Sequence, residues 1–411
     1  MSNTPWVSDK WFTSPWNFAP DAMQGFDFAK KIKFHDVTLR DGEQQAGLVF
    51  SKDQKIALAD KMAEMGMHRI EAGMPAVSPQ DREAIVEIAK RHQGPGEPEV
   101  FAFARCMKAD VLKAVDCGVK GIIIEIPASE HMVKYAYKWD YQKTIDLSIE
   151  ATKCAEENGL YTVFFTIDGT RTEMDTYFDL IKTVAKDGHM DALAVVDTMG
   201  GLAPHACNYL IKQVKKQVDV PLEVHFHDDF GLGCANTLMA LSAGAEVAHT
   251  TITGIGERAG NVAYEDLALS LLTMYGVDTG IDYSKMNELS KMMRGFCGHT
   301  IPSNRGIVGD TLANIESGIV ADWYVNAHEE HPLEVSPYLY SLVGHKDAEV
   351  VIGKMSGIPT VDIYLAQLGL ECSDKDTKME IVSKIKDKSF EKHGLLTVGE
   401  FEEIARKVLD K

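Results

Sequence analysis

The chain lacks the features that mark membrane and secreted proteins. No apolar run in its 411 residues approaches the roughly 18 that a membrane-spanning helix needs. Its 7 cysteines are scattered without a Cys-x-x-Cys pair, as in proteins that keep reduced thiols. The N-terminal segment, residues 1–20, has neither the basic nor the apolar region of a secretory signal. We therefore expect a cytoplasmic protein.

Basic residues are also scarce relative to acidic ones. The chain has 42 lysines and arginines against 61 aspartates and glutamates, which gives a formal net charge of −19. Binding to nucleic acid or to an anionic membrane needs a basic surface, so we expect neither partner. The hydrophobic share of 45% and the charged share of 25% are ordinary for a soluble globular enzyme.

What the sequence does contain is a regular alternation of short apolar runs and amphipathic stretches. Eight strands are predicted, at residues 32–37, 67–71, 100–103, 121–126, 161–166, 192–196, 222–226 and 247–254. Apolar residues recur at i, i+3 and i+4 between them, for example at residues 52–65, 79–92 and 141–158. Eight strand–helix units predict an α/β protein with a closed (β/α)8 barrel. No glycine-rich dinucleotide fingerprint follows the first strand, which disfavours the alternative, an open doubly wound sheet.

The pattern changes outside the barrel. Residues 1–30 form an extension that holds three of the five tryptophans, and the barrel is expected at residues 31–280. Residues 281–411 read as a linker and a small, mostly helical C-terminal region. Helices are predicted there at residues 283–297, 376–386 and 398–409.

Two histidines and one aspartate form the most informative pattern. His225 and His227 are two residues apart in a predicted strand, so their side chains face the same way. Asp41 follows the first strand, and its neighbour Arg40 is placed where negative charge would develop. Two imidazoles and a carboxylate that converge on one point make a divalent-metal site with open positions. The pattern indicates chemistry on a metal-bound carbonyl or carboxylate.

Polar residues also stand at the ends of the other strands, where barrel enzymes place their catalytic groups. We take Glu71, Asp168 and Asp197 as candidate catalytic residues and Arg105 as a candidate substrate ligand. Simpler structural interpretations remain open. Glu71 and Asp197 can be paired core carboxylates, and Glu257 with Arg258 can be a loop salt bridge.

Five motifs in fixed order resemble a known family, the metal-dependent Claisen-condensing branch of the aldolase-type (DRE-TIM) barrel metallolyases. This branch includes isopropylmalate, homocitrate and citramalate synthases. The resemblance covers roughly residues 31–370. The motifs are Thr38-Leu39-Arg40-Asp41-Gly42-Glu43-Gln44, Ile70-Glu71-Ala72-Gly73-Met74-Pro75, Asp197-Thr198-Met199-Gly200, His225-Phe226-His227-Asp228 and Gly254-Ile255-Gly256-Glu257-Arg258-Ala259-Gly260-Asn261.

The resemblance implies a role for each matching residue. Asp41, His225 and His227 would hold Mg²⁺, Mn²⁺, Zn²⁺ or Co²⁺, with Asn261 as a further ligand or a nearby donor. Arg40 would stabilise the oxyanion. Thr198 would bind the carboxylate of a 2-oxo acid, and Gln44 would border the same pocket. The implied reaction is condensation of acetyl-CoA, or another acyl-CoA, with the 2-oxo acid.

The sequence departs from the family where a general base is expected. Ile167 stands at the position of a glutamate that assists the base, and Ile315 and Val320 replace two histidines of the C-terminal region. Hydrocarbon side chains cannot move protons, so the motifs identify no base. Asp168, His131, His328 and Tyr338 are possible substitutes, and spacing favours none of them.

Two other functions remain open from the sequence. A carbon–carbon lyase or aldolase would use the same barrel, Arg40 and metal ligands to cleave a 2-hydroxy acid or its CoA ester. A non-catalytic paralogue that binds a ligand would fit the lost base, but it leaves the intact metal ligands unexplained. The loop at residues 256–261 resembles the synthases and lacks the cysteine usual in the lyases, which favours condensation. Relatives that act as dimers imply a homodimer or a higher homo-oligomer.

Overall fold

We describe residues 4–410 in a computed structural model of the chain. They form two compact units. One contains Trp16–Ile301, and the other combines residues 4–15 with residues 302–410. The sequence placed domain boundaries after residues 30 and 280, whereas the larger unit also includes residues 16–30 and 281–301. The expected domain organisation stays a prediction.

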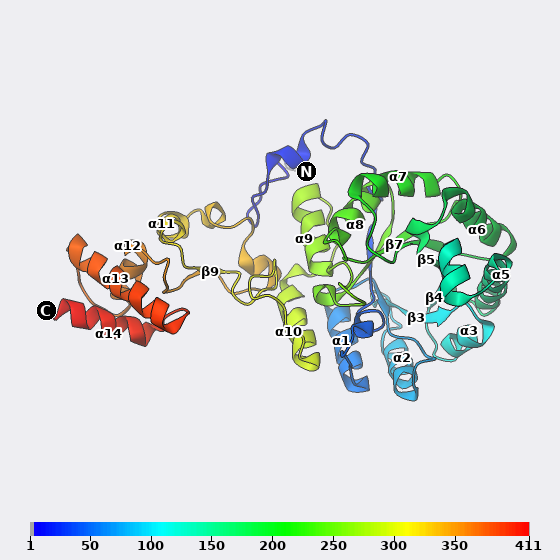
Figure 1. The fold of residues 1–411 in the computed structure, drawn as a ribbon, viewed down its shortest axis with the longest axis horizontal. Coiled ribbons are helices and arrows are strands. Elements are labelled where there is room, and N and C mark those ends of the chain that lie inside the picture. The colour runs from blue at the N-terminus through cyan, green and yellow to red at the C-terminus, as the bar shows by residue number, and fades with distance from the viewer. Residues whose placement is uncertain (1–3, 411) are drawn as a thin grey trace. The chain divides into compact units, whose positions relative to one another are not determined.

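The larger unit is a closed barrel of eight parallel strands in sequential order, as Figure 1 shows for the part labelled α1 to α10. This confirms the predicted fold class. The strands are β1 Lys33–Asp36, β2 Arg69–Glu71, β3 Glu99–Arg105, β4 Gly121–Pro127, β5 Tyr161–Ile167, β6 Ala192–Asp197, β7 Leu222–Phe226 and β8 Val247–Thr250. The barrel closes between its first and last strands, where His35 is in register with His249.

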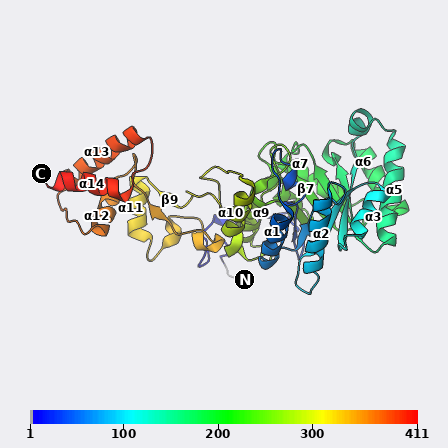
Figure 2. The same cartoon turned by 90° about the horizontal axis from the view of Figure 1, so that it is seen from below.

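Helices surround the strands, and the views in Figures 1 and 2 agree on this arrangement. They are α1 Lys52–Glu64, α2 Pro79–Arg91, α3 Lys108–Val115, α4 Glu130–Met132, α5 Tyr141–Glu157, α6 Met174–Asp187, α7 Pro204–Val214, α8 Gly233–Ser242, α9 Tyr264–Tyr275 and α10 Met286–Cys297. Short helical turns are η1 Pro15–Phe18, η2 Gly42–Gln44, η3 Val133–Tyr137, η4 Gly169–Arg171, η5 Ile252–Gly254 and η6 Tyr283–Lys285.

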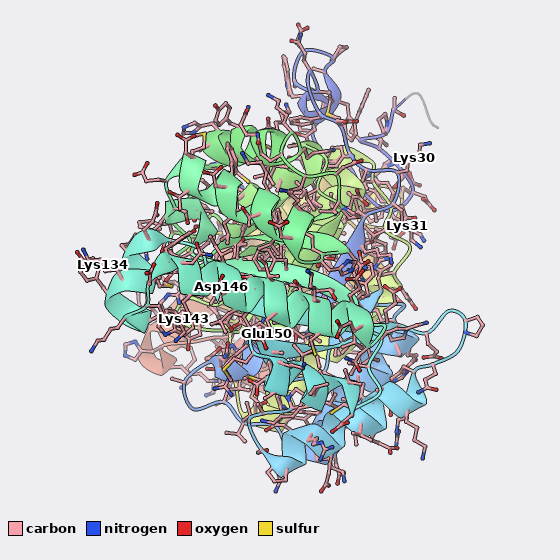
Figure 3. The ribbon with its side chains drawn as sticks, turned by 90° about the vertical axis from the view of Figure 1, so that its right-hand side faces the viewer. Lys30, Lys31, Lys134, Lys143, Asp146 and Glu150 are labelled. Carbon is pink, nitrogen blue, oxygen red and sulfur yellow. The ribbon has the colours of Figure 1, made fainter. Side chains whose placement is uncertain are left out.

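Helix α5 illustrates why the helices lie on the outside. Its buried face carries Thr144 and Ser148, whereas Asp146 and Glu150 are exposed. Figure 3 shows both acidic side chains on the outer side of this helix. Asp140 directly precedes the helix, and its side chain accepts a hydrogen bond from the backbone of Gln142 and so caps the first turn. Amphipathic periodicity thus decides which face meets the strands.

The end of the last strand differs from the sequence-based prediction. Residues 247–254 were expected to form one strand, but β8 ends at Thr250 and a 3-10 turn follows. Thr253 and Gly254 have φ angles of 59° and 77°, which no strand accommodates. The turn brings the loop at residues 256–261 over the end of the barrel strands.

The barrel interior is apolar in the middle of one wall. Inward-facing residues of β3 to β6 form this core: Phe101, Phe103, Ile123, Val163, Phe165, Ala192, Ala194 and Val196. They occupy alternate positions of their strands, as expected when one face of each strand points inward. Polar residues of β1, β2, β7 and β8 fill the remaining interior.

The smaller unit is mostly helical, as predicted, and has a core of its own. Its helices are α11 Gly318–Ala327, α12 Ile358–Gln367, α13 Lys375–Lys392 and α14 Val398–Leu409, with short turns η7 Pro332–Glu334 and η8 Tyr340–Val343. Two short parallel strands, β9 Asn314–Ile315 and β10 Glu349–Val350, were not predicted. Val361, Ile385 and Phe401 are fully buried in the core between α12, α13 and α14. The N-terminal segment joins this unit, because Phe12 N donates to Pro337 O at 2.9 Å and Leu339 N to Lys10 O at 2.8 Å.

Among residues 4–410, no helix is long and apolar enough to cross a membrane.

Candidate active site

Asp41, His225 and His227 meet at the C-terminal end of the barrel strands. Asp41 Oδ2 lies 3.6 Å from His225 Nε2 and 3.9 Å from His227 Nε2. All three side chains are buried, with relative exposures of 3%, 2% and 5%. Each offers one ligand atom, and these atoms lie within 4.8 Å of one another. The distances suit donors around a single metal ion, which the sequence motif predicted.

Hydrogen bonds orient this group for metal binding. His227 Nδ1 lies 3.2 Å from the carbonyl oxygen of Gly260 and can donate to it, which leaves the lone pair of Nε2 facing Asp41. Burial lowers the pKa of both histidines, so the imidazoles are held in the neutral form that ligates metals. Asn261 donates from Nδ2 to Asp41 Oδ2 and to Ile255 O, and its Oδ1 accepts no hydrogen bond from the residues that the structure describes.

Local backbone geometry brings these residues together. His225 and His227 are separated by one residue, so strand pleating turns both inward. His227 and Asn261 form an isolated bridge that ties β7 to the loop after β8. Gly256 has a φ of 151°, and a Cβ at this position would collide with Asn261 Nδ2. Glycine at position 256 therefore allows the amide to reach Asp41.

Arg40 connects this group to a second carboxylate. Its Nη1 donates to Asp41 Oδ1 at 3.0 Å, and its Nε donates to Glu71 Oε1. Its Nη2 is buried without a hydrogen-bond partner in the described chain. Burial alone would lower the pKa of Arg40, but Glu71 and Asp41 outweigh it and raise that pKa. The guanidinium is thus a fixed positive charge with one unused donor.

Asp168 and Asp197, two of the predicted catalytic residues, accept hydrogen bonds from residues in the loops around them. Asp168 accepts from Ser129 Oγ at 2.5 Å and from Arg171 Nε at 2.6 Å, and His131 Nε2 lies 3.3 Å away. Asp197 accepts from Thr170 Oγ1 at 2.7 Å and from the backbone of Leu202 at 3.0 Å.

The predicted substrate ligands have different surroundings. Gln44 Oε1 accepts from Arg40 Nη1 at 3.3 Å, so it lies beside the metal-ligand group. Thr198 Oγ1 accepts from the backbone N–H of Asp168 at 2.7 Å. Arg105 is half-exposed and pairs with Asp110 at 2.7 Å. Glu257 and Arg258 do form the salt bridge considered from the sequence, at 3.7 Å.

A pocket of about 320 Å³ opens beside Arg40 and Gln44, and its wall includes the apolar side chains of Leu48, Val49, Met74 and Val77.

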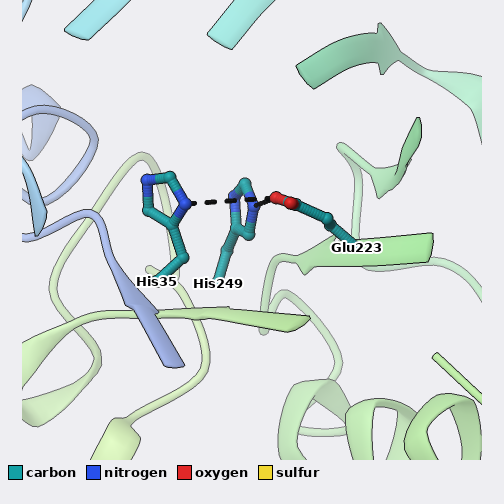
Figure 4. Close-up of side chains that lie close together, drawn as sticks. All are labelled: His35, Glu223 and His249. Atoms are coloured by element: carbon teal, nitrogen blue, oxygen red, sulfur yellow. Dashed lines mark hydrogen bonds and ion pairs between the residues drawn. The ribbon is translucent and has the colours of Figure 1, made fainter. Parts of the chain in front are cut away.

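The barrel interior contains a second group of the same composition, which the sequence analysis missed. His35 on β1, Glu223 on β7 and His249 on β8 lie together, fully buried (Figure 4). His249 Nε2 is 2.8 Å from Glu223 Oε2, and Arg69 Nη1 donates to Glu223 Oε1 at 2.6 Å. Within residues 4–410, neither ring nitrogen of His35 has a hydrogen-bond partner, although Nδ1 lies 4.0 Å from Glu223 Oε2 and Nε2 lies 3.6 Å from Glu71 Oε2. We call this set the core cluster, and Asp41, His225 and His227 the mouth cluster.

Glu125 on β4 is a further inward-facing polar residue that the sequence analysis missed. It interrupts an apolar strand, Ile122-Ile123-Ile124-Glu125-Ile126, and this interruption was the available signal. For the core cluster, the available signal was that Glu223, His225 and His227 stand at alternate positions, so that all three side chains face the same side of the strand.

Comparisons with known proteins identify the family to which the chain belongs. The HMGL-like family matches residues 31–293. The chain is 37% identical over 368 residues to the 2-isopropylmalate synthase of Methanocaldococcus jannaschii, covering 89% of this chain and 69% of that protein. It is 34% identical over 393 residues to a homocitrate synthase of Methanopyrus kandleri, covering 96% of each. A crystal structure of the Bacillus subtilis HMG-CoA lyase superposes with a TM-score of 0.59 over 67% of this chain and 96% of that one, at 20% identity, and supports the fold alone. The chain belongs to the HMGL-like family, in its branch of 2-isopropylmalate and homocitrate synthases.

Proposed function

We propose that the protein is an acyltransferase that condenses acetyl-CoA, or another acyl-CoA, with a 2-oxo acid. The condensation product is a CoA thioester, which water then hydrolyses, so the final products are a 2-hydroxy-2-alkyl dicarboxylate and CoA. The observation that carries this proposal is the mouth cluster beside Arg40, in a barrel whose relatives are named as synthases of this kind.

The donor set fits a divalent cation, since two neutral imidazoles and a carboxylate converge with Asn261 adjacent. Asp41, His225 and His227 would hold Mg²⁺, Mn²⁺, Zn²⁺ or Co²⁺, and Asn261 would orient Asp41 or add its oxygen. When bound, the cation would polarise the ketone of the 2-oxo acid.

Arg40 and its neighbours supply the remaining positive charge and orientation. Arg40 Nη2, the unused donor, would stabilise negative charge on the reacting oxygen, while Glu71 fixes the guanidinium plane. Gln44 and Thr198 would bind the oxo acid, with Arg105 farther out on β3. Asp168 and Asp197 would act mainly by holding the loops after β5 and β6 that frame the site.

Thiol release from acetyl-CoA tests this proposal. The purified protein is assayed with Mn²⁺ or Mg²⁺ and, in turn, pyruvate, 2-oxoisovalerate, oxaloacetate and 2-oxoglutarate. We expect release with one oxo acid, which names the substrate. The Asp41→Asn variant should retain the fold but lose metal binding and activity, because the amide cannot supply the anionic ligand.

If the metal-bound protein releases no thiol with any of the four oxo acids, that result would count against condensation. The same groups would then be tested for cleavage of 2-hydroxy acids and their CoA esters, the reaction of a carbon–carbon lyase. The same preparation allows sizing by light scattering, where a homodimer is the expected species. A cytoplasmic location likewise stays a prediction.

A further inference from the structure

Five of the six carboxylates in the eight barrel strands are held by partners. They are Asp36 with Thr38, Glu71 with Arg40, Glu99 with Lys33 and Arg69, Asp197 with Thr170, and Glu223 with Arg69 and His249. The sixth is Glu125 on β4. Its carboxylate makes no hydrogen bond or ion pair with any residue between 4 and 410. This group alone among the strand carboxylates is free to act on another molecule.

Glu125 faces the interior at the level of the mouth cluster. Ile123, two residues earlier, belongs to the interior core, so strand pleating turns Glu125 inward as well. Glu125 is in register with Arg105 on β3 and with Phe165 on β5. The guanidinium carbon of Arg40 lies 4.0 Å from the ring centre of Phe103 and 6.0 Å from that of Phe165. Arg40 and Glu125 thus share one wall of the barrel mouth.

The charges around Glu125 suit a group that both takes and releases a proton. Burial raises its pKa to about 7, Arg40 opposes this rise, and Asp41 and Glu71 add to it. Arg105 at the end of β3 and Cys106 just after it also interact electrostatically with Glu125. Tyr137 of η3, which follows β4, does so as well. The facing residue of β5, Phe165, does not titrate. A carboxyl with a pKa near the working pH is effective in general acid–base catalysis.

The position expected to assist proton transfer is apolar in this chain. Ile167 on β5 is in register with Pro127, which lies two residues after Glu125 on β4. The side chain of Ile167 packs against the interior core. Asp168 beyond it is bound by Ser129 and Arg171. A carboxylate on β4 is therefore the available acceptor on this side of the mouth.

We infer that Glu125 is the catalytic residue that takes the proton from the acyl carbon next to the thioester. The inference rests on the proposed condensation. An oxygen of Glu125 forms an O–H bond as the C–H bond breaks, and the freed electron pair makes the enolate that attacks the ketone carbon. The ketone oxygen becomes an alkoxide, and the proton on Glu125 returns to it directly or through water. The carboxylate is unchanged over one cycle.

Loss of deuterium from acetyl-CoA labelled on its methyl group isolates this step. Mass spectrometry follows the exchange with metal and each oxo acid present, next to thiol release. We expect Glu125→Gln to lower both rates about 10²–10⁴-fold, the usual contribution of a general base. Circular dichroism and metal content should match the unmodified protein. Glu130→Gln, a matched change in α4 just beyond β4, should leave both rates unchanged.

The two readouts separate this inference from the proposed function. Exchange at an unaltered rate in Glu125→Gln overturns the inference, even where thiol release confirms condensation. If deuterium exchange depends on Glu125 but no thiol is released, the inference is supported and the proposed condensation is overturned. If the unmodified protein neither exchanges label nor releases thiol, both are overturned.

The pH profile distinguishes a base from a structural carboxyl. For the unmodified protein, kcat/KM should fall as the pH drops below about 7, because protonated Glu125 cannot accept a proton. Glu125→Asp should keep this acid limb at a lower rate, whereas Glu125→Gln should lose it. An acid limb that persists in Glu125→Gln belongs to another group and overturns the inference.

Discussion

The mouth cluster and the core cluster each contain two imidazoles and one carboxylate, yet their surroundings differ. In the mouth, Asp41 Oδ2 faces two imidazoles at 3.6 and 3.9 Å. Asp41 and Glu223 each accept hydrogen bonds through both oxygens, Asp41 from Arg40 and Asn261, and Glu223 from Arg69 at 2.6 Å and His249 at 2.8 Å. The difference lies in the imidazoles: His249 Nε2 is hydrogen-bonded to its carboxylate, whereas the Nε2 atoms of His225 and His227 lie beyond hydrogen-bond distance of Asp41. Residue type alone therefore does not make a metal site, because the lone pairs must also be free.

Charge balance separates the clusters in the same way. Arg69 neutralises Glu223 inside a fully buried environment, so an added divalent cation would bring uncompensated charge into the barrel core. At the mouth, Arg40 is shared between Asp41 and Glu71, which leaves one net negative charge beside the pocket that Arg40 and Gln44 line. We expect one divalent ion per chain, bound at the mouth, with the core cluster serving the fold.

The largest expected effect comes from removing the core carboxylate. Glu223→Ala would leave Arg69 buried without its partner and His249 without an acceptor. Breaking a buried pair in this way costs about 3–5 kcal/mol in free energy of unfolding. Chemical denaturation measures this loss, and Asp41→Asn is the control that should change stability little while abolishing metal binding.

Metal content completes this comparison. The folded fraction of Glu223→Ala should still bind one ion per chain. Two ions in the unmodified protein, and one in Glu223→Ala, would show that the core cluster binds metal after all.

A smaller effect is expected at the edge of the mouth cluster. Asn261→Ala removes the amide that donates to Asp41, and with it one of the groups that orient this ligand. Loss of such a supporting partner typically lowers metal affinity 10–100-fold. Isothermal titration with Mn²⁺ gives the affinity. Unchanged affinity would mean that Asp41 is held by Arg40 alone.

The sequence predicted the mouth cluster better than the core cluster for a structural reason. His225 and His227 share a strand, so their common direction follows from pleating alone. His35 and His249 are 214 residues apart and become neighbours only because the barrel closes between β1 and β8. That closure was predicted, but not the register that sets these two residues side by side.

Spacing in the sequence also does not reveal whether a polar side chain is already held by hydrogen bonds from its neighbours. Asp168 stands at a strand end, as a catalytic residue would, but Ser129 and Arg171 hold its carboxylate. Glu125 is the reverse case, a carboxylate within an apolar strand that makes no hydrogen bond or ion pair with the described residues, 4–410. Such differences depend on long-range contacts, so the sequence located the site more securely than its proton-transfer group.

The smallest effect expected is a gain in stability within the core cluster. Both nitrogens of His35 are buried without hydrogen bonds to any residue between 4 and 410, since Glu71 Oε2 at 3.6 Å and Glu223 Oε2 at 4.0 Å are too far away, and the ring packs against Phe101 and His249 at 4.9 and 4.5 Å between ring centres. Phe has a similar shape and no polar atom to desolvate, so His35→Phe should raise the free energy of unfolding by about 1 kcal/mol. Denaturation midpoints measure the change, with metal content and thiol release expected to stay constant. A loss of stability together with a loss of bound metal would show instead that His35 is a ligand, and the contrast between the two clusters would fail.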